Sequence, residues 1–132
     1  MKKLTVFLCL VVVGTLGCAS TATMRSEPLE AGTVREFSGE YARILRAVRD
    51  AVVSSGLAID TFNEINETSA VIVAKKGASA FSWGELVRVV VQQSASDRTS
   101  VRVVTKRRLA TNVTAKGDYA DTIFSNIALA LR

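Results

Sequence analysis

The chain has 132 residues, of which 17 are basic and 12 acidic, and its formal net charge is +5. This length allows one hydrophobic core and is too short for two independent domains of ordinary size. Histidine is absent and only two cysteines occur, which excludes zinc sites built from Cys and His and nucleophiles activated by histidine. No glycine-rich phosphate loop is present either. The composition therefore argues against an enzyme, a cofactor site or a metal site.

The first 18 residues, MKKLTVFLCLVVVGTLGC, have the order of an export leader. A basic start is followed by an apolar middle and a small residue before the cleavage point. The apolar run over residues 4–16 has 13 residues, fewer than the roughly 17–25 that a membrane-spanning helix needs. The alternatives are an uncleaved N-terminal anchor, a buried helix, and a leader that is removed without lipidation.

The end of this leader resembles the cleavage site of bacterial lipoproteins, in which the cysteine that becomes the new N-terminus receives lipid. Gly17 and Cys18 fit the pattern, whereas Thr15 stands where leucine is usual. The resemblance implies a signal peptide over residues 1–17 and a Cys18 that carries a diacylglycerol and commonly an acyl chain such as palmitate. No aspartate follows Cys18. By the same resemblance this favours the outer membrane, facing the periplasm, over the inner membrane.

Cleavage before Cys18 would leave 115 residues and lower the formal charge to +3, because Lys2 and Lys3 leave with the leader. This charge is too small for a nucleic-acid-binding footprint. Residues 20–32, STATMRSEPLEAG, lack periodicity and contain the only proline, which predicts a flexible tether. We therefore expect a signal peptide over 1–17, a lipidated N-terminus and tether over 18–32, and a single domain over 33–132.

Two hydrophobic periods alternate along the rest of the chain. Residues 33–38 are predicted as a short first strand, and residues 39–55 as a helix with Ser38 as its N-cap. Asp118 is predicted to cap a last helix that ends at Leu131. Between the helices, alternation of apolar and polar residues predicts strands over 57–62, 70–75, 81–93 and 100–111.

This order predicts an α+β fold, (β)-α-β-β-β-β-α, with a four- to five-stranded antiparallel meander sheet and two helices packed on one face. The segments AVRDAVVSSGLAI, TSAVIVAKK, SVRVVTKRR and DYADTIFSNIALAL carry the pattern. In them the chain resembles small bacterial lipoproteins of unknown function that are related to the helix-grip domains of outer-membrane assembly lipoproteins. The resemblance implies a fold and an envelope location, and that group has no established activity to transfer.

Alternation along the last two strands places four cations on the face opposite the predicted core. Three aliphatic residues share this helix-free face, which makes it a mixed basic and apolar surface. We interpret the face as a contact site for an envelope protein or an anionic glycan or lipid. The alternative is a solvated sheet face with scattered aliphatic side chains. The cations are Arg88, Arg102, Lys106 and Arg108, and the aliphatic residues are Leu86, Val90 and Val104.

Phe81 and Trp83 alternate onto the core side, where they either pack in the core or line a cleft between sheet and helix. Gly84, next to Trp83, is a candidate bulge that would open such a cleft. The sequence thus favours a non-enzymatic, membrane-anchored envelope lipoprotein that binds another envelope component. A carrier of a small ligand or lipid is the alternative. A hydrolase that uses Ser or Thr with Lys ranks last, because no dyad motif is present.

Overall fold

A computed structural model describes residues 19–77, 84–108 and 117–132. Cys18, Phe81 and Trp83 lie outside the described residues, so the expectations that concern them stay predictions. Within the described part of the chain, no helix is both long and apolar enough to cross a membrane.

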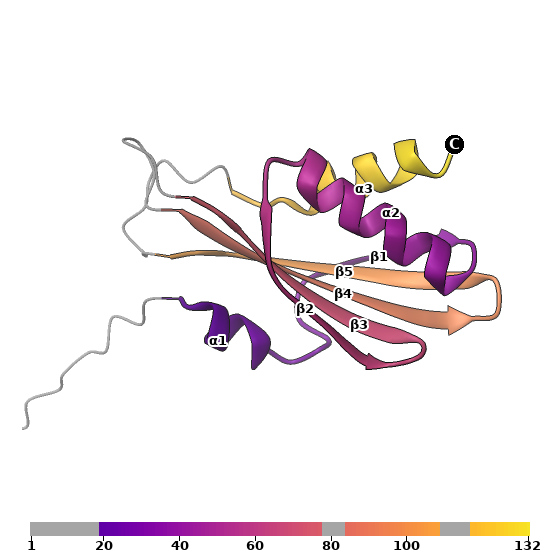
Figure 1. The fold of residues 1–132 in the computed structure, drawn as a ribbon, viewed down its shortest axis with the longest axis horizontal. Coiled ribbons are helices and arrows are strands. Elements are labelled where there is room, and N and C mark those ends of the chain that lie inside the picture. Colours follow the sequence, from indigo (N-terminus) through magenta and orange to yellow (C-terminus); the bar gives the residue numbers. More distant parts are fainter. Residues whose placement is uncertain (1–18, 78–83, 109–116) are drawn as a thin grey trace, which may run out of the picture.

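An antiparallel sheet of five strands forms the centre of the molecule, in the order β1-β5-β4-β3-β2 (Figure 1). Strands β2 to β5 form a meander, and β1 pairs with β5 at one edge. This confirms the predicted α+β fold and its antiparallel meander. The strands are β1 (Thr33–Ser38), β2 (Ala58–Asn66), β3 (Ser69–Lys76), β4 (Glu85–Ala95) and β5 (Arg98–Arg107).

Helices α2 (Tyr41–Ser54) and α3 (Ala120–Ala130) cover one face of this sheet, as predicted (Figure 1). Alternate residues of the central strands point toward them, and β-branched side chains pack well on such a pleated surface. Burial of this apolar layer is the main source of the domain's stability. Its core includes Ile72, Val87, Val89, Val91, Val101 and Val103 from the sheet, and Ile44, Val48, Val52, Ile123, Phe124 and Ile127 from the helices.

The helices begin later than predicted. Helix α2 has Glu40 at its N-cap, with no side-chain cap hydrogen bond, and Ser38 remains in β1. The chain reverses at Gly39, whose φ is 142° and whose N–H donates to the Asp97 carbonyl at 2.7 Å. Helix α3 has Tyr119 at its N-cap, and the predicted cap Asp118 lies one residue earlier, where its Oδ1 accepts a hydrogen bond from the Ala120 N–H at 2.9 Å.

A third helix, α1 (Thr21–Arg25), lies on the opposite face of the sheet (Figure 1). Its first turn is closed by a reciprocal pair: the Ser20 N–H donates to Thr23 Oγ1 at 2.8 Å, and the Thr23 N–H donates to Ser20 Oγ at 3.2 Å. Met24 is fully buried in a second apolar cluster. The predictions of a flexible tether and of a helix-free face are therefore corrected. A five-residue helix with one buried side chain is too short to show a hydrophobic period in the sequence.

Candidate functional site: the strap-covered face of the sheet

Residues 19–32, which we call the strap, cross the sheet on the face opposite α2 and α3. At one end the Ala19 N–H donates to the Arg108 carbonyl, just beyond β5, at 3.2 Å. At the other end the strap enters β1 through Gly32, where an added Cβ would lie 2.2 Å from the Val103 carbonyl oxygen. Gly32 also has a φ of 103°, which side chains other than glycine rarely adopt. The strap is thus fastened to β5 at both ends.

Met24 anchors the middle of the strap to the sheet. Its side chain packs with apolar side chains of β3 and β4 and has no exposed surface. Burial of a methionine side chain contributes about 1.5–3 kcal/mol. This is the principal apolar contact of α1. The cluster around Met24 consists of Val71, Val73, Leu86 and Val90, with Ala19 and Val104 at its margin.

Arg88 lies on this face and is fully buried under the strap. Its Nη1 donates to the Glu27 carbonyl, and its Nη2 donates to the Pro28 carbonyl at 2.6 Å. Burial lowers the pKa of the Arg88 guanidinium, and the nearby charge of Glu30 acts in the opposite direction. A buried charge is costly unless polar groups replace its water. The two strap carbonyls provide that replacement for Nη1 and Nη2, whereas Nε is buried without a hydrogen-bond partner in the described structure.

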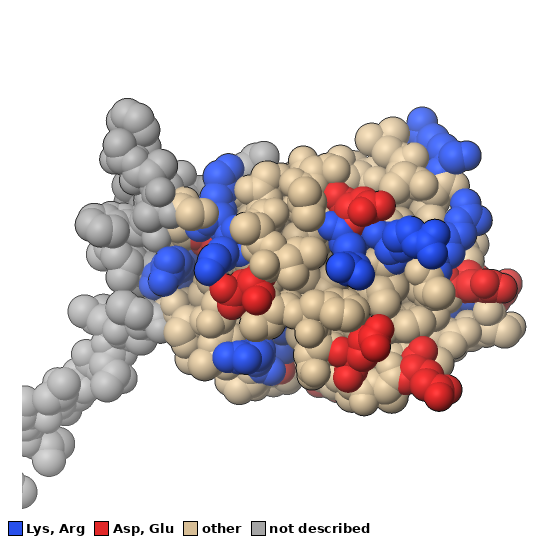
Figure 2. Space-filling view, in the orientation of Figure 1, with Lys and Arg blue, Asp and Glu red and all other residues tan. Residues whose placement is uncertain are grey.

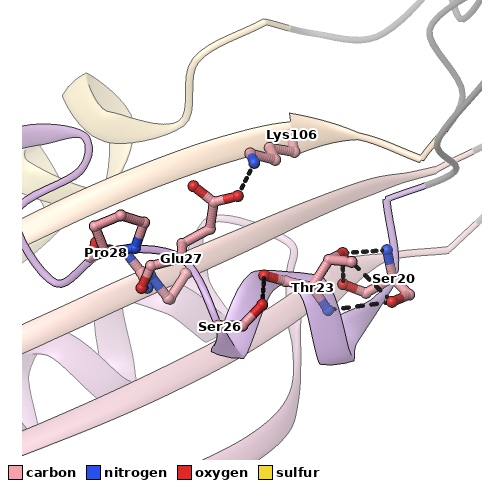
Figure 3. Close-up of polar contacts among 7 residues, drawn as sticks. Ser20, Thr23, Ser26, Glu27, Pro28 and Lys106 are labelled. Carbon is pink, nitrogen blue, oxygen red and sulfur yellow. Dashed lines mark hydrogen bonds and ion pairs between the residues drawn. The ribbon is translucent and has the colours of Figure 1, made fainter.

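Two more of the predicted cations are also held by the strap. The Lys106 ammonium forms an ion pair with the Glu27 carboxylate (Figure 3). Arg102 donates from Nη1 to the Glu30 carbonyl at 2.8 Å. Arg108 lies exposed just beyond the end of β5, and its backbone carbonyl accepts the hydrogen bond from the Ala19 N–H. The structure therefore brings three of the four cations together and leaves Arg108 at the strand end.

This arrangement changes what the face can bind. While the strap is in place, no partner reaches Arg88, and the chain's own carbonyls and carboxylate stand where an external anion was predicted. The register confirms the predicted mixture of cations and aliphatic residues, because Val90 pairs with Arg102 and Arg88 with Val104. The ligands of the cations were not predicted, because backbone carbonyls carry no sequence signature.

A groove of about 510 Å³ remains open on this face, between the strap and β2. Leu29 and Ile65, which line it, are 40% and 48% exposed. Val71 forms its floor, and Arg25 lies at its rim. Exposed apolar side chains beside a cation are typical of a protein contact site. No sequence pattern marks Leu29, Ile65 or Arg25 as contact residues.

A second groove, of about 440 Å³, lies between α2 and β2. The Tyr41 hydroxyl is buried there and has no hydrogen-bond partner in the described structure. Burial raises the pKa of Tyr41, and the charge of Glu64 adds to this effect. Arg46 lines the same groove. This groove is a cleft between helix and sheet of the kind that the alternative prediction requires, and the predicted cleft at Trp83 lies outside the described residues.

A buried carboxylate and a phenol form a pair near the start of β4. Glu85 is 2% exposed, and its Oε2 accepts a hydrogen bond from the Tyr119 hydroxyl at 2.9 Å. Burial, this hydrogen bond and the Glu85 charge together raise the pKa of Tyr119 to about 12. Tyr119 therefore keeps its proton and acts as a donor that joins α3 to the sheet. This pair was not predicted from the sequence, because the two residues lie far apart in the chain.

Comparison with models of protein families and with curated proteins gives no match to this chain. The functional interpretation therefore rests on the sequence and on the geometry of the site.

Proposed function

We propose that this chain is a lipid-anchored protein of the bacterial envelope, without enzymatic activity, that binds another envelope component through the groove between the strap and β2. The leader that ends at Cys18 supports the anchor, and the outer membrane facing the periplasm is the proposed location. The groove supports the binding role, since Leu29 and Ile65 expose apolar surface beside Arg25. The resemblance to small bacterial lipoproteins supports the envelope location.

The strap links the anchor to the groove. It begins at Ala19, the residue after Cys18, and its later residue Leu29 forms one wall of the groove. Consecutive Cα atoms are about 3.8 Å apart, so a lipid on Cys18 would be attached almost directly to the end of β5. The domain would then sit close to the membrane, and a partner in the groove would be held there with it.

The predicted contact residues have an indirect role in this proposal. Arg88, Arg102 and Lys106 hold the strap on the sheet, and the strap in turn forms the groove. The partner is expected to offer an apolar side chain to Leu29 and Ile65, with a carboxylate directed toward Arg25. A segment of an envelope protein fits this description better than a glycan, which lacks an apolar side chain.

Site-specific crosslinking of the full chain in cells tests the proposal. Leu29→Asp and Ile65→Asp should each abolish the crosslink between the groove and its partner, because a carboxylate would replace the apolar contact. Leu129→Asp is the matched control, since Leu129 is 59% exposed on α3, away from the groove. Retention of the partner by Ile65→Asp, or its loss with Leu129→Asp, would count against the groove.

A second candidate function is the binding of a small ligand or lipid in the cleft between α2 and β2. The buried Tyr41 hydroxyl favours it, because an unpartnered polar group in a groove is free to bond to a ligand. Native mass spectrometry after gentle extraction distinguishes the two candidates. A bound mass that disappears with Tyr41→Phe would support the role of a ligand or lipid carrier. A chain without any bound ligand would contradict that role.

A further inference from the structure

One end of the sheet is basic. It is the end at which β3 and β5 stop and β4 begins, and it carries five described cations. Lys75 pairs with Asp60 at 2.7 Å, and Lys106 pairs with Glu27. The remaining three, which we call the basic end, are exposed and have no acidic partner among the described residues. They are Lys76, Arg107 and Arg108.

The basic end is built by the strand register. Lys76 of β3 and Arg107 of β5 both pair with Glu85, so the two cations flank the same position of β4. Arg108 follows Arg107 directly and is fixed through its backbone, because its N–H donates to the Gly84 carbonyl at 3.3 Å. Glu85 between them is buried and bonded to the Tyr119 hydroxyl, and it is therefore turned away from the exposed surface.

The two hairpins at the opposite end of the sheet are mainly acidic. The β2–β3 and β4–β5 hairpins and the start of α2 carry Glu64, Glu67, Asp97 and Glu40 there, and Arg98 is paired with Glu36 at 3.7 Å. Figure 2 shows acidic surface over the two hairpins at the lower right and basic surface next to the grey atoms at the left, with a further basic area above the hairpins at the right. β4 spans ten residue steps, so the two ends lie about 34 Å apart at roughly 3.4 Å per step.

The first described residue meets the basic end. The Ala19 N–H donates to the carbonyl of Arg108, at 3.2 Å, so Cys18 is joined to the chain within about one Cα–Cα step, roughly 3.8 Å, of this point. The place where the chain enters the domain and the exposed cations therefore coincide.

We propose that the sheet stands end-on on an anionic lipid surface, with Lys76, Arg107 and Arg108 against the headgroups and the acidic hairpins directed away. This inference rests on the proposed function for the lipid anchor at Cys18. Each cation near an anionic membrane raises the equilibrium constant for the end-on orientation roughly fivefold, so three cations together raise it on the order of a hundredfold. The acidic hairpins lie several Debye lengths away, since that length is about 8–10 Å at physiological salt.

This orientation sets the height of the groove above the membrane. Val71, at the floor of the groove, lies five residue steps along β3 from Lys76, or about 17 Å at roughly 3.4 Å per step. The groove then opens sideways, clear of the headgroups, toward a partner anchored in the same membrane or approaching from the aqueous phase.

Dye quenching on the full mature chain tests this orientation. The chain is reconstituted into nanodiscs of phosphatidylcholine with or without phosphatidylglycerol, and a quencher is attached to the headgroups. A dye is placed at the basic end through Gly77→Cys or at the β4–β5 turn through Ser96→Cys. We expect strong quenching at position 77 and little at 96, with a larger difference in the anionic discs.

Charge reversal supplies the decisive comparison. Reversal of all three charges at the basic end should reduce the difference in quenching between positions 77 and 96 in anionic discs to its value in phosphatidylcholine discs. The three changes are Lys76→Glu, Arg107→Glu and Arg108→Glu. The control with the same change in net charge is Arg46→Glu, Arg98→Glu and Arg132→Glu, which should leave the difference intact. Equal quenching at both positions, or no effect of reversal at the basic end, overturns the end-on orientation.

The intact mass of the same samples separates this inference from the proposed function. Absence of lipid on Cys18 shows that the proposed anchor is wrong. Sedimentation of the unlipidated chain with phosphatidylglycerol vesicles then tests the basic end by itself. Binding that is lost with the Lys76, Arg107 and Arg108 reversal, and kept by the control, supports the basic end as a lipid contact. Absence of binding, or equal loss in both variants, contradicts it.

Discussion

Replacement of Met24 by alanine should release the strap while the rest of the domain stays folded. Met24 is fully buried between α1 and the sheet, and a helix of five residues is too short to be stable by itself. Truncation of a buried methionine to alanine costs about 2–5 kcal/mol. One factor of ten in an equilibrium corresponds to about 1.4 kcal/mol, so opening of the strap should become about 30- to 5,000-fold more frequent.

Hydrogen exchange followed by mass spectrometry measures this opening. The Met24 and Ser26 N–H groups donate to the carbonyls of Ser20 and Ala22 at 3.0 and 3.2 Å, and their exchange reports on the strap. We expect both amides to exchange faster by the factor above, with no change in α2. Leu29→Ala is the control within the same segment. Its side chain is 40% exposed, so its effect should stay below about fivefold, or 1 kcal/mol. Equal acceleration of the strap and α2, or unchanged exchange in the strap, would refute a separately fastened segment.

Three further predictions concern other contacts. Gly32→Ala should lower the free energy of unfolding by about 2 kcal/mol or more in urea titrations, because the new Cβ would meet the Val103 carbonyl. Gly77→Ala is the control, and it should change the free energy of unfolding by less than about 0.5 kcal/mol, since open space surrounds Gly77. Arg88→Lys should speed exchange in the strap about tenfold or more, because a single ammonium does not reproduce the fork that donates to two carbonyls; unchanged exchange would argue against this role of the guanidinium. The Tyr119 pKa of about 12, raised from 10.0, means that the unfolded chain loses this proton first as pH rises. The higher pKa of Tyr119 in the folded chain therefore contributes about 2–3 kcal/mol to the free energy of unfolding below pH 10, and this contribution is lost between pH 10 and 12. Tyr119→Phe should reduce the decline in the free energy of unfolding between pH 10 and 12. It should also lower stability at pH 7 by about 1–3 kcal/mol, since the buried Glu85 carboxylate loses a donor. An unchanged decline between pH 10 and 12 would contradict the assignment of this titration to Tyr119.

The sheet was predictable because its central strands alternate strictly. Val87, Val89 and Val91 face the core, and Arg88 and Val90 face away, as the period of two requires. The start of α2 was not predictable, because it depends on the hydrogen bond from Gly39 to the Asp97 carbonyl, between residues far apart in the sequence. Local signals indicated the strands, α2 and α3, whereas α1 was missed and tertiary contacts determined where the elements begin and end.

The candidate site was predictable only in part. Alternation placed Arg88 and Arg102 on the correct face, since that inference needs only the strand period. The strap that binds them was missed, because its contacts use the backbone carbonyls of Glu27, Pro28 and Glu30, which any sequence would present. A buried arginine is therefore the clearest signal that another segment must cover such a face.

The intact mass of the mature chain extracted from membranes tests the proposed lipid anchor most directly. We expect a chain that starts at Cys18 and carries the added mass of a diacylglycerol and an acyl chain, with both the lipid and membrane retention lost in Cys18→Ser. A mature chain with an unmodified Cys18, or one that starts at another residue, would contradict the anchor.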